Sequence, residues 1–252
     1  MDRPAVALVG SEHEENLSLR DLAAAAEQAG FRAEIVAYDG GPARAAAVRL
    51  ALAAEPLAIG ISVPFQHRAQ EMLSLAQELR DAGYTGHITT GGHFATFEHA
   101  AILRAHPAID SVVRHEGEET LVELCAALRD GEPLRPLPGL VLRASGQKRL
   151  PVAGRPAEVA IDVGPERPLP KLDRLPFPDR RGEAMEILGV RSAPVIGSRG
   201  CYADCSFCCI HAYAEAAKGP RYRMRSVAGI VAEMHAEYTR RGVRLFVFHD
   251  DN

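Results

Sequence analysis

The segment "AVALVGSEHEENLSLRDLAAAAEQAGFRAEIVAYD", residues 5–39, decides the fold. Its first six residues form an apolar run of strand length. Residues 16–30 then repeat apolar side chains at helical spacing and end at a glycine. Residues 31–39 return to a strand pattern. A strand, a helix and a second strand in close succession predict a βαβ unit with parallel strands.

The same alternation continues to about residue 145. Further strand patterns cover 56–63, 87–92 and 109–117, and further helical patterns cover 42–55, 69–83, 96–106 and 118–131. Five βα units in a row predict an α/β fold, a doubly wound parallel sheet with helices on both faces, as the first domain, 1–145. In such a sheet, ligands bind at the carboxyl ends of the strands.

Two further parts follow this domain. The helix–strand alternation is lost from about residue 137, where "LPGLVLRASGQ" (137–147) could form a hairpin. Residues 146–190 include the proline-rich, charged stretch "VGPERPLPKLDRLPFPDRRGE", so we predict a linker there. Residues 191–252 hold a strand, a cysteine-rich loop, a helix and a final strand. Because one βαβ unit cannot close a sheet by itself, we expect a portion of a longer protein, or an incomplete catalyst.

The composition excludes several classes of protein. The 252 residues carry a net charge of −4, which gives no basic excess for nucleic acid or an anionic membrane. No apolar run reaches the roughly 18–20 residues of a membrane-spanning helix, and the N-terminus has no signal-peptide pattern. We therefore expect a cytoplasmic protein whose thiols stay reduced. Clustered cysteines then favour metal binding or catalysis over disulfides, whereas Cys125 is predicted to be a core thiol.

The loop "GCYADCSFCC" carries four of the five cysteines. Cys201, Cys205 and Cys208 stand at the spacing C-x3-C-x2-C. A zinc site usually takes four protein ligands, and the candidates for the fourth are the adjacent Cys209 and the better-spaced His211. Three thiolates instead suit a 4Fe-4S cluster with one iron left open to a substrate. The loop lies between a strand and a helix, where a βα fold places its chemistry.

This cysteine loop resembles the signature of the radical S-adenosylmethionine (radical SAM) enzymes, including the aromatic Phe207 before the third cysteine. The resemblance implies that the three cysteines ligate the cluster and that SAM caps the fourth iron. Reduction would then cleave SAM into methionine and a 5′-deoxyadenosyl radical. The resemblance also implies a flavodoxin- or ferredoxin-type electron donor and places Phe207 near the adenine. Asp250 and Asp251 fall where the family contacts the SAM methionine; capping of a following helix is the alternative.

The strand ends of the first domain carry small residues and histidines. They read "GSEHEEN" (10–16), "SVPFQH" (62–67), "GGHFAT" (91–96) and "RHEGEET" (114–120). Ser62 can donate a hydrogen bond, and a Gly91–Gly92 pair lets a large flat ligand approach the backbone. No G-x-G-x-x-G motif follows the first strand, so a dinucleotide site has little support.

These segments, together with "LDRLPFPDR" in the linker, resemble the cobalamin-binding domain that precedes many radical SAM cores. The resemblance covers nearly the whole chain and implies a flavodoxin-like sheet followed by the first βαβ part of a partial (β/α) barrel. It places one group of residues at the nucleotide tail of cobalamin, namely Ser62, Gly91 and Gly92, with His93 and His67 near the site. It places a second group near the corrin ring, namely Glu116, Gly117, Glu118 and Thr120.

The loop after the first strand departs from the cobalamin pattern. Domains that supply a histidine to the cobalt carry D-x-H-x-x-G there, whereas this chain has His13 between Ser11 and Asn16. A ligating histidine normally needs a carboxylate to fix its tautomer. Glu12 or Glu14 could supply one. Cobalt ligation by His13 and a solvated loop histidine therefore both remain open.

The sequence thus predicts a cobalamin-dependent radical SAM enzyme, or its front part, with 4Fe-4S, SAM and cobalamin as cofactors. The usual reaction of this family is methyl transfer to an unactivated centre of a small-molecule or natural-product-like substrate. Oxidative cyclisation or rearrangement without methyl transfer is an alternative. A cobalamin carrier or sensor whose cysteine loop is vestigial or holds zinc is another, and metal content separates it from the enzyme.

Overall fold

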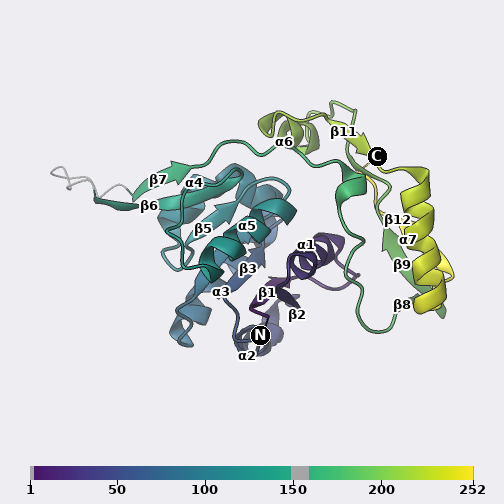
Figure 1. Cartoon of the computed structure of the whole chain (residues 1–252), viewed down its shortest axis with the longest axis horizontal. Helices are drawn as coiled ribbons and strands as arrows, with labels where there is room; N and C mark the ends of the chain where they lie inside the picture. Colours follow the sequence, from purple (N-terminus) through teal and green to yellow (C-terminus); the bar gives the residue numbers. More distant parts are fainter. Residues whose placement is uncertain (1–2, 149–158, 252) are drawn as a thin grey trace.

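The computed structural model describes residues 3–148 and 159–251. Its N-terminal part is a seven-stranded sheet with the order β2-β1-β3-β4-β5-β6-β7 (Figure 1). The strands are β1 (Ala5–Gly10), β2 (Arg32–Ala37), β3 (Ala58–Ser62), β4 (His87–Gly91), β5 (Ser111–Val113), β6 (Leu140–Lys148) and β7 (Val159–Val163). The first five are parallel, as the alternation predicted.

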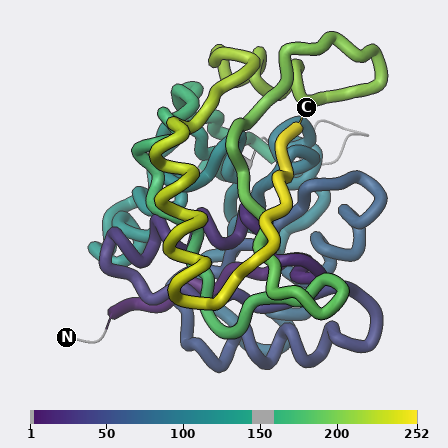
Figure 2. The backbone as a smooth tube through the Cα atoms, turned by 90° about the vertical axis from the view of Figure 1, so that its right-hand side faces the viewer, coloured from purple at the N-terminus to yellow at the C-terminus, as the bar shows by residue number. Residues whose placement is uncertain are grey.

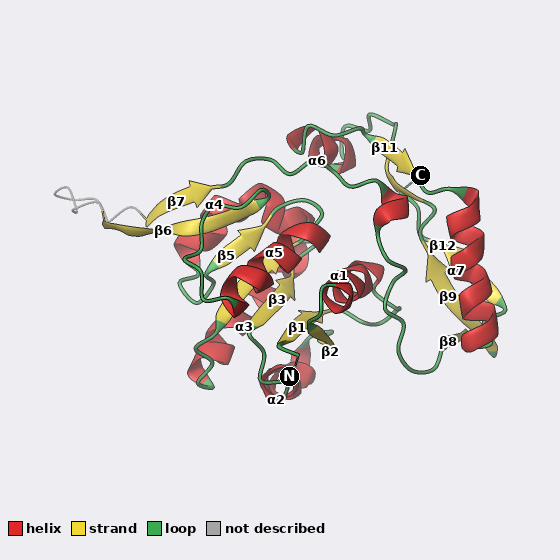
Figure 3. Ribbon diagram, viewed as in Figure 1, coloured by secondary structure: helices red, strands yellow, loops and turns green. Residues whose placement is uncertain are grey.

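Five helices cover the two faces of this sheet (Figure 3). They are α1 (Leu17–Gln28), α2 (Arg44–Ala53), α3 (Gln66–Asp81), α4 (His93–Ala105) and α5 (Glu118–Arg129), with a short 3-10 turn η1 (Gly41–Ala43) before α2. Helices α1 and α5 pack on one face, and α2, α3 and α4 pack on the other. The predicted doubly wound α/β fold is therefore confirmed.

The apolar first strand explains why both faces are covered. All six residues of β1 are buried. Val6 and Leu8 face the core under α1 and α5, whereas Ala7 and Val9 face the core under α2 and α3. Because successive side chains of a strand point to opposite faces, an unbroken apolar run is stable only between two layers of helices.

The far edge of the sheet extends beyond the first 145 residues. The possible hairpin at 137–147 is instead one strand, β6, which pairs antiparallel with β5. Its other partner is β7, from within the predicted linker, so the sheet extends past residue 145 to Val163. Part of that linker, 149–158, lies outside the described residues. The local pattern missed β7 because its own residues show no clear alternation, and only its pairing with β6 identifies it as a strand.

The C-terminal part contains the predicted parallel βαβ unit. Strand β9 (Val190–Val195), helix α7 (Val227–Arg240) and strand β12 (Leu245–Phe248) form it, and α7 packs against β9 (Figure 2). The short strand β8 (Met185–Ile187) pairs antiparallel with β9, so regular structure begins before residue 191. Between β9 and α7 lie the antiparallel strands β10 (Ser198–Gly200) and β11 (Tyr222–Met224), and helix α6 (Ile210–Ala216).

Residues 164–184 connect the two parts and contain a single 3-10 turn, η2 (Leu172–Arg174). This segment is anchored to both parts. The Asp179 amide donates to the backbone carbonyl of Arg20 on α1, and the Arg20 guanidinium donates to the Asp179 carbonyl. Asp173 accepts hydrogen bonds from the backbone and hydroxyl of Ser226 at the start of α7. None of the helices in the two described ranges has the length and apolar character that a membrane crossing requires.

Candidate functional site

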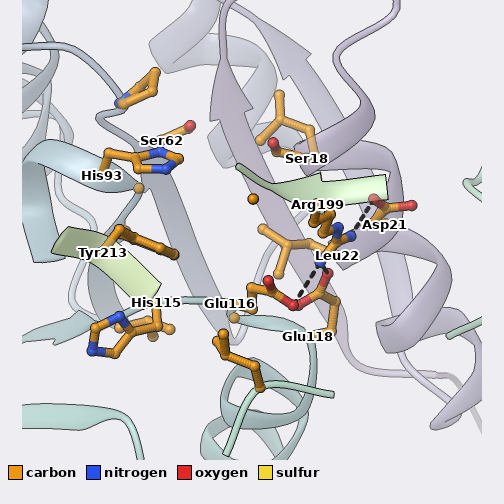
Figure 4. A pocket seen from close by; sticks show the side chains of 18 of the residues that line it. Ser18, Asp21, Leu22, Ser62, His93, His115, Glu116, Glu118, Arg199 and Tyr213 are labelled. Atoms are coloured by element: carbon orange, nitrogen blue, oxygen red, sulfur yellow. Dashed lines mark hydrogen bonds and ion pairs between the residues drawn. The ribbon is translucent and has the colours of Figure 1, made fainter. Parts of the chain in front are cut away.

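The carboxyl edge of the large sheet faces the C-terminal unit across a cavity of about 260 Å³ (Figure 4). One wall comes from α1, the ends of β3, β4 and β5, and the start of α5. The opposite wall comes from β10, α6 and the segment 220–223. The volume is near the lower end of the roughly 300–1,000 Å³ that is usual for small-molecule sites. Both parts of the chain therefore build one site, at the sheet edge where a doubly wound fold binds its ligands.

Small side chains line the sheet side of this cavity. Gly60 and Ser62 belong to β3, Thr90 and Gly91 belong to β4, and Gly92 follows directly. At Gly92 the backbone φ is 109°, and an added Cβ would lie 2.8 Å from the Val63 carbonyl oxygen. Only glycine adopts this conformation without strain. The structure thus brings the predicted Ser62, Gly91 and Gly92 together in a slot that lets a ligand approach the backbone.

Two arginines and three carboxylates form a second group at the cavity. Arg199, from β10, binds Asp21 at 2.7 Å, Glu116 at 2.9 Å and Glu118 at 2.8 Å. Arg223, from β11, also pairs with Glu116. Glu116 and Glu118 were predicted to lie near the corrin ring, and Gly117 between them also lines the cavity. The arginines come from the C-terminal unit, so this group ties the two walls together.

Asp21 is a buried carboxylate that pairs with Arg199. Burial, with smaller contributions from the neighbouring Glu118 and Glu233, raises its pKa to about 7, although Arg199 opposes the rise. Glu118 is also buried, and its Oε2 has no hydrogen-bond partner among the described residues. A buried carboxylate oxygen without a donor is costly.

Aromatic rings form the remaining wall of the cavity. Tyr213 of α6 packs on His93, with ring centroids 4.2 Å apart, and meets His115 edge-on at 5.0 Å. Burial lowers the pKa of both histidines and raises that of Tyr213, so all three rings are neutral at neutral pH. The wall can therefore pack against a large apolar or flat ligand without adding charge.

The cysteine loop comes directly after β10, which belongs to the wall opposite the large sheet. Cys201, Cys205 and Cys208 lie between β10 and α6; Cys205 is exposed, and the other two are partly exposed. The sulfur of Cys201 accepts a hydrogen bond from the backbone of Ala203, and the Cys208 amide donates to the Cys205 carbonyl. Among the described residues, no three His, Cys, Asp or Glu side chains converge as a single metal ion would require. Three accessible thiols on one short loop fit the donor set of an iron–sulfur cluster.

The other cysteines have different surroundings. Cys125 belongs to α5 and is fully buried in the core that α5 shares with α1, as predicted for a core thiol, and burial raises its pKa to about 12. Cys209 is exposed. His211, the alternative zinc ligand, points its Nε2 toward Asp204 at 3.9 Å.

The strand-end aspartates hold the backbone that leads into the cysteine loop. Asp250 accepts hydrogen bonds from the amides of Gly197 and Ser198, at 2.7 and 3.1 Å. Asp251 accepts one from Gly200 at 2.8 Å, and it also lines the cavity, whereas Asp250 does not. Both carboxylates fix the position of the residues just before Cys201.

Three predicted residues lie away from the cavity wall. Thr120 is buried, and its hydroxyl donates to the Pro138 carbonyl and accepts from Arg167. Phe207 is 92% exposed on the cysteine loop. His67 stacks on Phe65 and is exposed at the start of α3.

His13 has a carboxylate partner, though neither of the two that the sequence suggested. Its Nε2 lies 3.5 Å from Asp39, which follows β2, while Glu12 pairs with Arg20. The His13 side chain is 76% exposed and does not line the cavity. Ser11 also donates a hydrogen bond to Asp39, so this aspartate takes the place of the missing carboxylate in the motif.

Sequence reasoning missed Asp21, Arg199, Arg223, Tyr213 and His115 as site residues. Asp21 lies within a helical pattern, and nothing local distinguishes it from a solvated helix residue. Arg199 stands two positions before Cys201, which was the available signal. All five reach the cavity through contacts between segments far apart in the chain.

Comparison with known proteins supports the assignment of both parts. Residues 3–125 match the family model of the B12 binding domain. The fold of the whole chain is similar to the radical SAM methyltransferase TsrM from Kitasatospora setae, solved with cobalamin and a 4Fe-4S cluster, at 20% identity, a TM-score of 0.69 and 48% of that chain. It is also similar to the cobalamin-dependent SAM radical enzyme OxsB, at 19% identity, a TM-score of 0.72 and 34% of that chain.

Curated relatives agree with these structures. An uncharacterized methyltransferase of Pyrococcus horikoshii is 32% identical over 164 residues, which is 65% of this chain and 33% of the relative. An anaerobic magnesium-protoporphyrin IX monomethyl ester cyclase of Cereibacter sphaeroides is 29% identical over 192 residues, which is 75% of this chain and 29% of the relative. The chain thus spans about a third of the length of the curated relatives it matches.

These comparisons indicate the class of protein. Residues 3–125 match the B12 binding domain, and the fold of the whole chain is similar to the cobalamin-dependent radical SAM proteins TsrM and OxsB. The resemblance predicted from the sequence is confirmed.

Proposed function

We propose that this chain forms the cobalamin site and the beginning of the radical SAM core of a cobalamin-dependent radical SAM enzyme. We propose methyl transfer to an unactivated centre of a small-molecule substrate as its reaction. One observation carries the proposal. The cavity has the B12-binding domain as one wall, and its other wall continues within two residues into the three-cysteine loop. Two reactive centres held on facing walls of one cavity would be close enough to act on one substrate.

In this proposal the slot of small residues receives the nucleotide tail of cobalamin. Ser62 supplies a hydrogen bond there, and Gly91 and Gly92 allow close approach. Glu116 and Glu118 accept hydrogen bonds from amide groups at the corrin rim, and the Oε2 of Glu118 has no hydrogen-bond partner among the described residues. When bound, cobalamin supplies the methyl group or the redox chemistry, and the protein positions it and excludes water.

In the same proposal Cys201, Cys205 and Cys208 hold a 4Fe-4S cluster that binds SAM at its open iron. When bound, the cluster supplies the electron that cleaves SAM, and a flavodoxin- or ferredoxin-type protein delivers that electron. Asp250 and Asp251 hold the loop backbone in place, and Asp251 faces the cavity from there. Tyr213 and His93 form a neutral wall that keeps water from the reacting groups.

A second reaction has a specific observation in its favour. Two curated relatives, at 29% and 30% identity, are named anaerobic magnesium-protoporphyrin IX monomethyl ester cyclases. Oxidative cyclisation with the same cofactors is therefore the second candidate. Methyl transfer stands first because the TsrM structure and the Pyrococcus horikoshii relative are both named methyltransferases.

Anaerobic reconstitution with iron, sulfide and hydroxocobalamin tests the proposal. We expect about four irons per chain, a bound-cobalamin absorption spectrum, and an EPR signal of the reduced cluster that SAM perturbs. Cys205→Ala should lose most of the iron, whereas the matched control Cys209→Ala should keep it. Cobalamin binding without iron would instead identify a carrier or sensor module, and absence of both cofactors would refute the proposal.

A further inference from the structure

We propose that Arg199 is a positioning residue that couples occupation of the cobalamin cavity to the order of the cysteine loop. This inference rests on the proposed function, because it takes the cavity ligand to be cobalamin. Arg199 itself touches no reacting atom in this proposal. It acts by holding the backbone of β10, and with it Cys201, against carboxylates of the B12-binding domain.

The contacts of Arg199 reach two separate elements of the opposite wall. Its guanidinium binds Asp21 on α1, and Glu116 and Glu118 at the junction of β5 and α5. A planar guanidinium can bind several acceptors at fixed directions, which a lysine ammonium cannot reproduce. A shift of α1 relative to the start of α5 would therefore change the contacts of the Arg199 guanidinium.

A short, anchored backbone joins Arg199 to Cys201. Ser198 and Gly200, on either side of Arg199, donate their amides to Asp250 and Asp251. Gly200 has a φ of 86°, and a Cβ there would lie 2.1 Å from the Arg221 carbonyl oxygen, so β10 fits tightly against the neighbouring strand. A displacement of the Arg199 side chain is thus passed to a backbone that has little freedom to absorb it.

The charge balance gives the cavity ligand a way to act on Arg199. Three carboxylates share Arg199 and Arg223, so one negative charge is left over when all are ionised. Glu118 lines the cavity, and its buried Oε2 has no hydrogen-bond partner among the described residues. Cobalamin carries primary amides around its corrin ring. An amide N–H that binds Glu118 would compensate its charge and stabilise the arrangement in which Arg199 holds all three acceptors.

Hydrogen–deuterium exchange of the full chain, with and without hydroxocobalamin, tests this coupling. In the wild type we expect cobalamin to slow exchange about 5-fold or more in a peptide that covers residues 198–205. In Arg199→Met this slowing should fall below about 2-fold, although cobalamin still binds by its absorption spectrum. Arg199→Lys should restore part of the effect. Arg244→Met, an exposed arginine of the same unit, should behave as the wild type.

Helix α6 provides an internal control in the same experiment. It lines the cavity through Tyr213 and Ala214, independently of Arg199, so cobalamin should still slow exchange of residues 210–216 in Arg199→Met. A variant that was only less stable would raise exchange in both peptides and leave the cobalamin effect in place. If Arg199→Met proves poorly folded, Glu118→Gln keeps the arginine and weakens one anchor, and it should reduce the same cobalamin effect.

The outcomes separate the two levels of the proposal. Equal slowing of residues 198–205 in wild type and Arg199→Met, with cobalamin bound to both, would overturn the coupling and leave the proposed function intact. A wild-type chain that does not bind cobalamin would overturn the proposed function and the coupling together. Loss of the effect in Arg244→Met as well would also refute a specific role for Arg199.

Discussion

Arg180 should be the most sensitive position for the docking of the two parts of the chain. Its side chain is 2% exposed and binds Glu15, before α1, at 2.6 Å and Glu233, on α7, at 2.8 Å. Removal of one partner from a buried ion pair costs about 3–5 kcal/mol. Each carboxylate keeps a second arginine, Arg225 on Glu233 and Arg241 on Glu15. We therefore expect Arg180→Met to cost about 3 kcal/mol, at the lower end of that range.

This cost should appear mainly as opening of the connecting segment. A loss of about 3 kcal/mol raises the open population roughly 100-fold. Trypsin cleavage at Lys171 and Arg174, followed by mass spectrometry, reports that population when opening is faster than cleavage. The next residue offers a matched control. Arg181 is 49% exposed and pairs with Glu27 and Asp179, so Arg181→Met should cost less than about 1 kcal/mol. Equal cleavage rates for the two variants would refute the reasoning.

Three further predictions concern the cavity. The pKa of Asp21 rises from 3.8 to about 7 on folding, so as the pH increases the Asp21 carboxyl loses its proton in the unfolded chain before it does in the folded one. The free energy of unfolding should therefore fall by up to about 1.4 kcal/mol per pH unit between about pH 4 and 7. Asp21→Asn should flatten urea-denaturation midpoints over that range; an unchanged slope would contradict the assignment. Ser62→Leu should fill the slot and weaken hydroxocobalamin binding at least about 10-fold in a spectrophotometric titration, while the exposed Thr239→Leu should leave it unchanged. Gly92→Ala should lose about 2 kcal/mol or more in urea denaturation, because its φ of 109° and the Val63 carbonyl oxygen exclude a Cβ; a wild-type midpoint would show that the backbone relaxes.

Much of the fold was predictable because it depends on patterns among residues that are only a few positions apart. The apolar run of β1 and the helical spacing of α1 both involve residues a few positions apart, and their alternation determines a parallel, doubly wound sheet. The three cysteines are equally local, since their chemistry depends on spacing within one loop. Strand β7 was missed because its own residues show no clear alternation, and only its pairing with β6 identifies it as a strand.

The pairing of charged side chains, in the cavity wall and between the two parts of the chain, was decided by the tertiary structure alone. Arg199 and Asp21 are 178 positions apart, and Arg180 and Glu15 are 165 apart, so no local pattern links them. The same holds for Asp39 beside His13, where the carboxylate expected within the motif comes from the end of another strand. Short-range spacing determines which elements form, because backbone hydrogen bonding and side-chain direction repeat over a few residues. Which charged side chains form ion pairs is decided only in the folded chain, because burial removes them from water and each is then stabilised by an opposite charge close to it.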